Sequence, residues 1–303
     1  MKIKALTIFI ILGAVICLIY NKVEANDDYY TKIKDFLQEN MKGEGFIPTP
    51  YGADTRFAPK SIWIYHNKIA KDKDRAQEIK AWVLLSSGRA IYTDDFSPVK
   101  KSKVKLPTDK TTLSNKLALT LSLTGNLPVA SAELSTDFLK EKGIDIDINL
   151  GSSEIEYCEY FDMLLAQNAN AHIVDQMNSI LRMKFGKKIP PRRVIVSALR
   201  VKNASFNFKT KDNKIVNFDA GIDADKVKIV TNFAARLGLK WDKEKKVFRS
   251  LELDDWKYIA FQAIFTDETG KISSAKEIIS EEFCNDNENW DFRSEFMKED
   301  FNK

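Results

Sequence analysis

The clearest pattern along the chain is a strict two-residue alternation of apolar and polar positions between residues 116 and 150. From Lys116 to Thr124 each odd position is a leucine and each even one is basic, small or polar; the leucines are Leu117, Leu119, Leu121 and Leu123. Past Gly143 the apolar members are Ile144, Ile146, Ile148 and Leu150, and the polar ones are Asp145, Asp147 and Asn149. Side chains of a strand alternate between two faces, so this period predicts strands with one buried and one solvated face. Carboxylates at every second position exclude the doubly buried parallel strand. The segment is therefore predicted to form antiparallel amphipathic ribbons, with a weaker alternation from Val129 to Leu134.

Apolar residues at helical spacing predict two helices, one over Asp27 to Met41 and one over Asp162 to Lys184. The stripe of the second helix, which we expect to cover the apolar face of the ribbon, is Leu165, Ala169, Ile173, Met177, Ile180 and Leu181. A short strand is predicted over Ser61 to Tyr65, followed by a charged connection from Lys68 to Arg75, whereas Glu78 to Leu85 fits helix or strand equally well.

After Pro190 and Pro191 the two-residue period returns and predicts a run of short antiparallel strands joined by tight turns. These predicted strands are Val194–Ala198, Ser205–Lys209, Ile215–Ala220, Val227–Val230, Ala235–Trp241, Val247–Leu253 and Trp256–Phe265. The fold class predicted from the whole pattern is α+β, a mostly antiparallel twisted sheet with amphipathic β-ribbons and packed helices.

The first 25 residues have the composition of an export signal. Lys2 and Lys4 precede an uninterrupted apolar run from Ala5 to Tyr20, and a polar segment then ends in Val-Glu-Ala. Small residues at Val23 and Ala25 predict cleavage before Asn26. An uncleaved anchor is the alternative, because the run is only slightly shorter than a spanning helix. The predicted organisation is a signal peptide over 1–25, a single α+β domain over 26–280 and an acidic tail over 281–303, in a protein that is periplasmic or secreted.

The net charge of +4 divides unevenly along the chain. The tail from Glu281 to Lys303 holds eight acidic and three basic residues and carries −5, so the rest of the chain carries +9. Lysines gather just before the leucine ribbon, and they are candidates for contact with anionic lipid: Lys100, Lys101, Lys103, Lys105 and Lys116. No aromatic residues interleave them, so nucleic acid is not an expected partner.

Two cysteines, Cys158 and Cys284, remain after the predicted cleavage. In an oxidising compartment they either form a disulfide that ties the tail to the ribbon region or remain two separate thiols, and the sequence supports both readings equally.

Motifs of known catalytic sites are missing from the sequence. It contains no glycine-rich phosphate loop, no Gly-x-Ser-x-Gly, no His-Glu-x-x-His and no Cys-x-x-Cys, and it has only two histidines. We therefore predict no catalytic residues, no cofactor and no metal site, although an unmarked pair of carboxylates has no fixed spacing by which to recognise it.

The order of elements from Lys116 onward resembles the pore-forming domain of bacterial gasdermins. The resemblance is carried by Leu117 to Leu134, Ile144 to Tyr160, the helix Asp162 to Lys184, Arg193 to Thr210 and Phe233 to Phe265. It implies a protein that a short C-terminal segment holds inactive and that proteolysis releases to insert its ribbons as a transmembrane barrel. On that reading the leucines and isoleucines of the alternating segments face lipid, the acidic tail is inhibitory, and the protein oligomerises only when it forms a pore.

Three function classes follow from the sequence. The first is an exported, non-catalytic envelope protein that is membrane-active in the manner of gasdermins. The second is an envelope interaction or structural protein without membrane insertion, with an anionic membrane or an envelope component as partner. The third is an enzyme with an unmarked carboxylate site.

Overall fold

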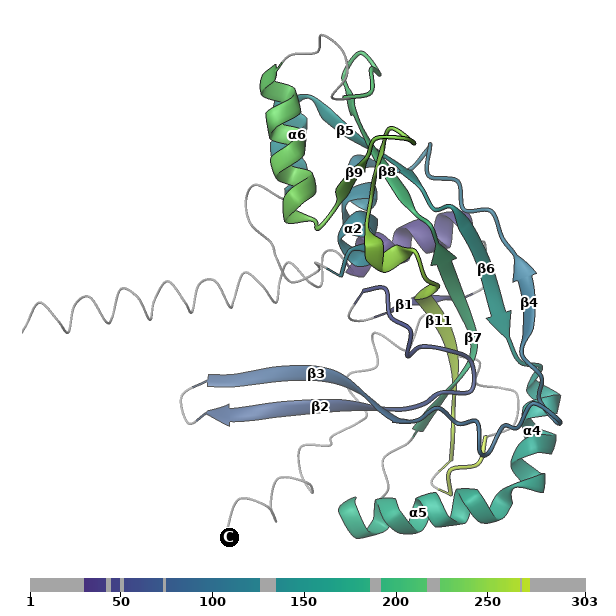
Figure 1. Ribbon diagram of the computed structural model, residues 1–303. Helices are drawn as coiled ribbons and strands as arrows, with labels where there is room; N and C mark the ends of the chain where they lie inside the picture. Colours follow the sequence, from purple (N-terminus) through teal and green to yellow (C-terminus); the bar gives the residue numbers. More distant parts are fainter. Residues whose placement is uncertain are drawn as a thin grey trace, which may run out of the picture.

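The structure is a computed structural model that describes residues 30–41, 45–49, 52–72, 75–125, 135–185, 192–216, 224–267 and 269–272, with the backbone alone at 65–83, 184 and 185. A helix over 30–40 comes first. The labelled elements of Figure 1 are β1 (Ile47–Pro48), β2 (Ile62–Asp72), β3 (Arg75–Ser86), β4 (Lys100–Lys103), α2 (Leu113–Leu123), α3 (Thr136–Lys142), β5 (Ile144–Asn149), β6 (Ser152–Tyr157), α4 (Tyr160–Ala169), α5 (Ala171–Phe185), β7 (Arg192–Lys202), β8 (Ser205–Thr210), α6 (Ala224–Arg236), β9 (Lys240–Asp242), β10 (Val247–Arg249) and β11 (Lys257–Phe265). Each strand ladder is antiparallel, so the predicted α+β class is confirmed.

Strand β7 is the centre of the larger sheet, whose order is β1-β11-β7-β2-β3. One edge of β7 pairs with β11 along most of its length. The other edge forks: Arg192 to Val194 pair with β2, whereas Ser197 to Lys202 pair with β6, which in turn pairs with β4. The sheet therefore splits into two arms that leave β7 in different directions (Figure 1).

The β2–β3 arm is a long hairpin. The predicted strand from Ser61 to Tyr65 continues to Asp72, so the expected charged connection over Lys68 to Arg75 is wrong. The segment that fitted helix or strand is strand β3, and β2 and β3 stay in register from Ile62 to Asp72 with a single irregularity next to Trp63. Because only Ile62 to Ile64 pair with β7, the rest of the hairpin projects from the sheet (Figure 1).

The second sheet has the order β5-β8-β10-β9. Gly151 turns the chain out of β5 and into β6 of the larger sheet at a φ of +61°, where a Cβ would come within 2.4 Å of the Lys202 carbonyl oxygen. Only glycine fits such a position. Strands β5 and β6 therefore belong to different sheets, although they are neighbours in the sequence.

Two predictions in the C-terminal half are corrected. The strands expected over Val227–Val230 and at the start of Ala235–Trp241 are helix α6, with only Lys240 to Asp242 extended. The buried residues Val230, Phe233, Ala234 and Leu237 recur at three- and four-residue intervals, which is the helical period. Asp225 in the first turn and Arg236 in the last complement the helix dipole. Of the strand expected over Ile215–Ala220, the structure describes a single bridge from Ile215 to Lys209, and 217–220 lie outside the described residues.

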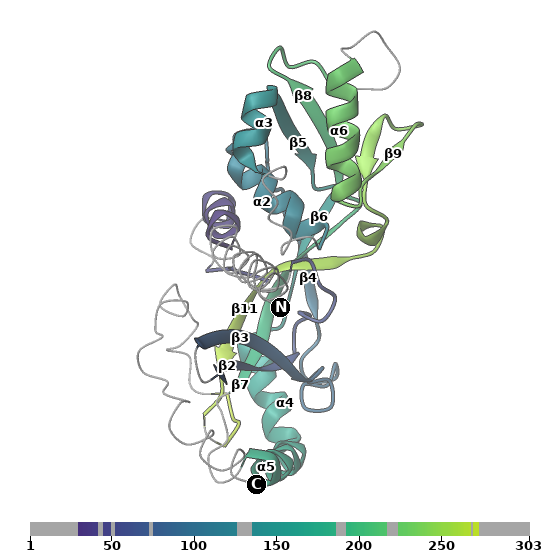
Figure 2. The same cartoon turned by 90° about the vertical axis from the view of Figure 1, so that its left-hand side faces the viewer.

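The helix predicted over Asp162 to Lys184 is two helices, α4 and α5, which meet at Asn170. Asn170 Nδ2 donates to the Ile91 carbonyl at 2.9 Å and to the Ala166 carbonyl at 3.1 Å. The pair packs against Ile62, Tyr92 and Val194 of the larger sheet and its loops, so it does not cover the ribbon as predicted. Figures 1 and 2 show α4 and α5 at one end of the molecule and α2, α3 and α6 at the other.

Candidate functional site

The leucine segment, which alternation predicted to be a strand, is helix α2. Thr112 begins it as the N-cap, and its side chain accepts a hydrogen bond from the Asn115 amide at 3.3 Å. The four alternating leucines are all buried, and so is each residue from Asn115 to Leu123. A helix that is buried on every side has no polar face, so a two-residue period does not prevent it from packing.

The partners of α2 come from distant parts of the sequence. The same apolar cluster contains Phe36 of the N-terminal helix, Ile146 of β5 and Phe233 of α6. Figure 2 shows α2 between the N-terminal helix and the small sheet. In the helix these surroundings bury α2 on all sides, whereas an amphipathic strand would bury only its leucine face.

Hydroxyl groups on the even positions of α2 are poorly accommodated. Thr120 Oγ1 donates to the Lys116 carbonyl at 2.8 Å and Thr124 Oγ1 to the Thr120 carbonyl at 2.9 Å. Such bonds to the preceding turn weaken a helix slightly. Ser122 Oγ is buried and has no hydrogen-bond partner among the described residues. An unsatisfied buried hydroxyl is destabilising, so α2 holds one polar group, the hydroxyl of Ser122, that the described residues do not satisfy.

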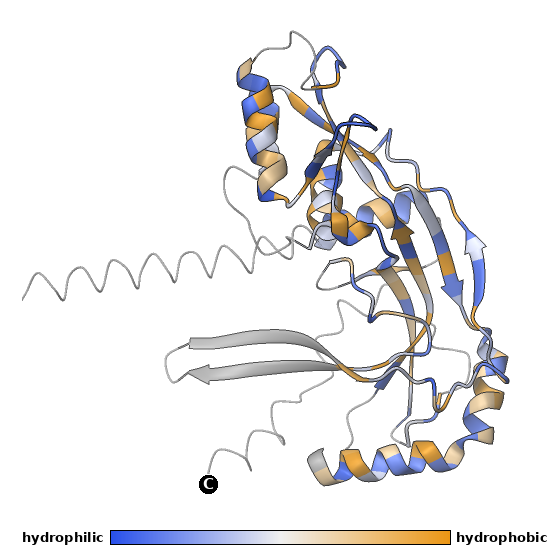
Figure 3. Cartoon of the chain, in the orientation of Figure 1, coloured by the Kyte–Doolittle hydropathy of each residue, from blue (hydrophilic) through white to orange (hydrophobic). Residues whose placement is uncertain are grey.

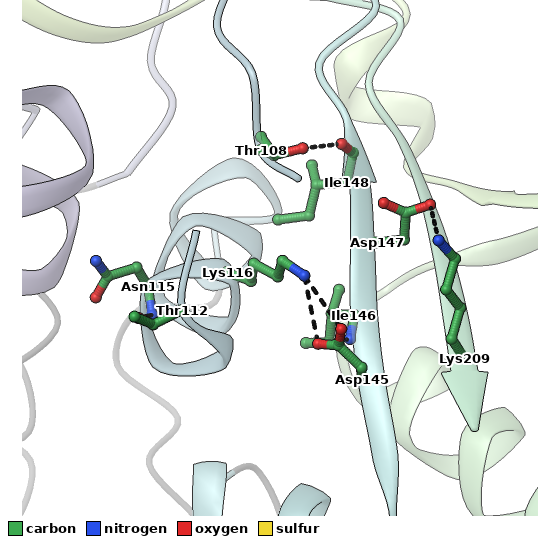
Figure 4. Close-up of polar contacts among 9 residues, drawn as sticks. All are labelled: Thr108, Thr112, Asn115, Lys116, Asp145, Ile146, Asp147, Ile148 and Lys209. Atoms are coloured by element: carbon green, nitrogen blue, oxygen red, sulfur yellow. Dashed lines mark hydrogen bonds and ion pairs between the residues drawn. The ribbon is translucent and has the colours of Figure 1, made fainter. Parts of the chain in front are cut away.

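Strand β5 has the alternation that the sequence predicted. Ile144, Ile146 and Ile148 are buried against α2, and Leu150 just after the strand is buried too. The polar face meets β8, where Asp147 Oδ2 lies 3.0 Å from Lys209 Nζ. Thr108 Oγ1 donates to the Ile148 carbonyl and holds the preceding loop on the strand (Figure 4).

Lys116 ties α2 to β5. Its side chain is only 8% exposed, and its Nζ lies 3.2 Å from Oδ2 of Asp145, which is 48% exposed (Figure 4). In this conformation Lys116 is therefore not a surface lysine, and its contact with anionic lipid stays a prediction. No local sequence pattern marks this pair, because its members are 29 residues apart.

The other lysines lie on or just after the edge strand β4. Lys100, Lys101, Lys103 and Lys105 are all exposed. Lys100 Nζ is 3.2 Å from Glu159, a contact that raises the pKa of the lysine, and Lys101 Nζ is 3.4 Å from Glu156. Two of the four charges are thus paired: the Lys100–Glu159 pair is exposed on both sides and therefore weak, whereas the partner of Lys101, Glu156, is buried.

Cys158 is buried beside β7, and its amide donates to the Val196 carbonyl at 2.9 Å. Burial raises the pKa of its thiol above the ordinary value. Cys284 lies outside the described residues, as do the alternation at Val129 to Leu134, the predicted signal peptide and the acidic tail. The disulfide therefore stays a prediction.

In the part of the chain that the structure describes, no three His, Cys, Asp or Glu side chains gather as metal ligands would. Within the same part, none of the helices is both long and apolar enough to cross a bilayer.

The sequence matches no protein-family model and no curated protein. The structure is similar to that of a bacterial gasdermin from Bradyrhizobium tropiciagri, with a TM-score of 0.43 and 13% sequence identity, over 80% of this chain and 89% of that one. The faint resemblance to bacterial gasdermins seen in the sequence thus has a counterpart in the structure, of the low similarity that these values give.

Proposed function

We propose that this protein acts on membranes, and that the segment from Leu113 to Leu150 inserts into a bilayer as amphipathic strands once the C-terminal tail is released. The observation that carries the proposal is helix α2. Its sequence alternates leucine with basic, small and polar residues over nine positions, although a helix buried on all sides makes no use of that alternation. As a strand, the same nine residues would separate cleanly into a lipid face and a water face.

In the inserted strand, each side chain that is poorly accommodated in helix α2 would lie on a face that suits it. In a strand, Leu117, Leu119 and Leu121 face lipid, whereas Thr120 and Ser122 face water. The buried hydroxyl of Ser122 then gains the hydrogen bonds that it lacks in the helix. Lys116 and Asp145 both fall on the water face, so their ion pair does not oppose insertion.

Strand length sets a limit on how far the segment reaches. A transmembrane strand needs about 9–11 residues. Lys116 to Thr124 provide such a strand, whereas β5 with Leu150 is about two residues short. The second strand therefore requires either extension past Gly151 or a locally thinned bilayer.

The exposed lysines on and after β4 would make the first contact with the membrane. A lysine near an anionic surface contributes about 1 kcal/mol to binding. Export by the N-terminal leader is part of the proposal and places this contact at the cell envelope.

Dye release from anionic liposomes tests the proposal, with the full chain compared with a chain that lacks Glu281 to Lys303. We expect faster release from the shortened chain and a weaker effect at high salt. Lys103→Glu with Lys105→Glu should slow release from anionic but not from neutral vesicles. Lys211→Glu with Lys214→Glu, two exposed lysines elsewhere, make the same change in net charge and are the matched control.

If neither chain releases dye at micromolar concentration and low salt, membrane insertion is refuted, and an envelope interaction protein remains. Equal effects of the two lysine pairs would instead show that only net charge matters and that β4 is not the contact surface.

A further inference from the structure

Helices α4 and α5 carry apolar side chains on two sides, and only one side is packed. Met163, Ala166 and Val174 are buried against the larger sheet. Facing away from this core, Phe161 is 67% and Leu165 is 45% exposed on α4, four residues apart. On α5, Ile180 is 60% and Met183 is 80% exposed, three residues apart. These four residues form two rows, and we call them the α4–α5 apolar rows; Figure 3 shows the apolar positions along both helices.

Residues three or four apart lie on the same face of a helix, so the two members of each row are neighbours on one face of their helix. Large apolar side chains concentrated on one element mark a contact surface. Half of the eight large, exposed apolar side chains in the described residues belong to these two helices. The remaining question is what covers them.

The described chain ends beside these helices and is fixed there by their side chains. Asn178 Nδ2 of α5 donates to the Thr269 carbonyl at 2.5 Å. The Ile272 amide donates to Gln167 Oε1 of α4 at 2.9 Å, and Ile272 is itself buried. The last described residue is therefore held against α4.

Arg192 of β7 also contacts the last described segment of the chain, from Thr266 to Ile272. Its Nη2 donates to Asn178 Oδ1 at 2.6 Å, and a Cβ on Gly270 would lie 1.8 Å from that nitrogen. The Thr266 amide donates to the Arg192 carbonyl at 2.9 Å. These contacts determine where the tail begins: whatever follows Ile272 starts at the α4–α5 pair.

The tail that follows has the length and composition to cover both rows. The 31 residues from Ser273 to Lys303 reach about 100 Å when extended, whereas α5 is about 22 Å long. Large apolar residues recur along it: Ile278, Ile279, Phe283, Trp290, Phe292, Phe296, Met297 and Phe301. Its charge of −5 from Glu281 onward also complements the +9 of the rest of the chain.

We propose that the C-terminal tail docks on the α4–α5 apolar rows and that this is the surface it must leave when released. The inference rests on the proposed function only in the inhibitory role given to the tail, and its primary measurement, proteolysis of the tail, is made without membranes. The alternative occupants of this surface are a second copy of the chain and a lipid surface, and the test below distinguishes them from the tail.

Trypsin cleavage of the full chain at Arg293 and Lys298, followed by mass spectrometry, measures how often the tail is undocked. Cleavage of a transiently opened segment follows the population of the open form. Ile180→Asp and Phe161→Asp should each speed cleavage by about tenfold or more, because each removes a large apolar side chain from the contact. Leu251→Asp is the control, because Leu251 is 64% exposed and lies outside α4 and α5.

Phe296→Asp in the tail should have the same effect as Ile180→Asp, and the double variant should be no faster than either alone, because both remove one contact. Unchanged melting temperatures show that the exposed substitutions leave the fold intact.

Equal cleavage rates in all variants would overturn the inference. If Ile180→Asp leaves cleavage unchanged but converts a dimer to a monomer in sedimentation, the occupant is a second copy; if it instead reduces liposome binding, the occupant is lipid. Either result removes the tail from this surface. If the cleavage rates change as predicted but the protein releases no dye from liposomes, docking of the tail is supported and the proposed function is refuted.

Discussion

Ser122→Ala should stabilise the protein, although Ser122 lies in the most enclosed helix of the fold. Ser122 is 1% exposed, and its hydroxyl has no hydrogen-bond partner among the described residues. Leaving a buried hydroxyl unsatisfied costs about 1–3 kcal/mol. Alanine also favours the helix by about 0.5 kcal/mol relative to serine. We therefore expect the free energy of unfolding to rise by about 2 kcal/mol, which for a chain of this size raises Tm by about 3 °C.

Ser179→Ala is the matched control for this measurement. Ser179 is also in a helix, but it is exposed and its Oγ donates to the Asp175 carbonyl at 2.9 Å. Alanine there should gain no more than about 0.5 kcal/mol of helix propensity. Urea unfolding and thermal melting of the three proteins give the comparison.

The same substitution has a consequence for the proposed function. Stabilising the conformation in which α2 is a buried helix by about 1.4 kcal/mol lowers the population of any opened form tenfold. Under the proposed function, Ser122→Ala should therefore slow dye release in proportion to its gain in stability. If Ser122→Ala stabilises the protein no more than Ser179→Ala does, then the claim that the surroundings of α2 accommodate the Ser122 hydroxyl poorly is refuted.

Three further predictions concern other parts of the fold. Ile146→Asp should cost about 2–4 kcal/mol by placing an unpaired charge in the core, whereas Asp147→Ser, which loses only a surface pair with Lys209, should cost less than about 1 kcal/mol; equal melting temperatures would show that the faces of β5 are misassigned. Gly151→Ala should cost at least about 1 kcal/mol in urea unfolding, because its φ is +61° and the new Cβ would meet the Lys202 carbonyl, and a neutral result would mean that the turn between the sheets is not constrained. Burial raises the pKa of Tyr258 above its ordinary value of 10.0, so its stabilising contribution is present below about pH 10 and falls as the pH rises further; a Tm that does not decrease between about pH 9 and 11 would contradict this burial.

The sequence predicted β5 correctly because each level of the structure agrees with its pattern. Its isoleucines are buried in the core beside α2, whereas Asp145 and Asp147 are partly exposed and pair with Lys116 of α2 and Lys209 of β8, so the two-residue period has its usual meaning of one buried and one polar face. The fold class followed from the same reasoning. The predicted N-terminal helix is also present, with Ile33, Phe36, Leu37 and Met41 buried at helical spacing.

The sequence failed for α6 and for the break between α4 and α5 for two separate physical reasons. In α6 the helical stripe is present, but short windows such as Val227 to Val230 do not distinguish a helix from a strand. The break at Asn170 depends on a hydrogen bond to Ile91, 79 residues away, and no local pattern encodes it. The Lys116–Asp145 pair was missed for the same reason.

Helix α2 differs from both of those cases, because its sequence pattern is strong and the structure still departs from it. Local preference and global fold agree along most natural sequences, and the exceptions are concentrated at functional sites. If α2 were only a buried helix, an apolar side chain of similar size would suit positions 120 and 122 better than Thr120 and Ser122, which are 0% and 1% exposed. Under the proposed function, the alternation would be used in a state where one face of the segment is wet, and β5 is already an amphipathic strand. In that proposal α2 would change from helix to strand, β5 would be the preformed strand beside which it pairs, and any extension of β5 past Gly151 would add to the change.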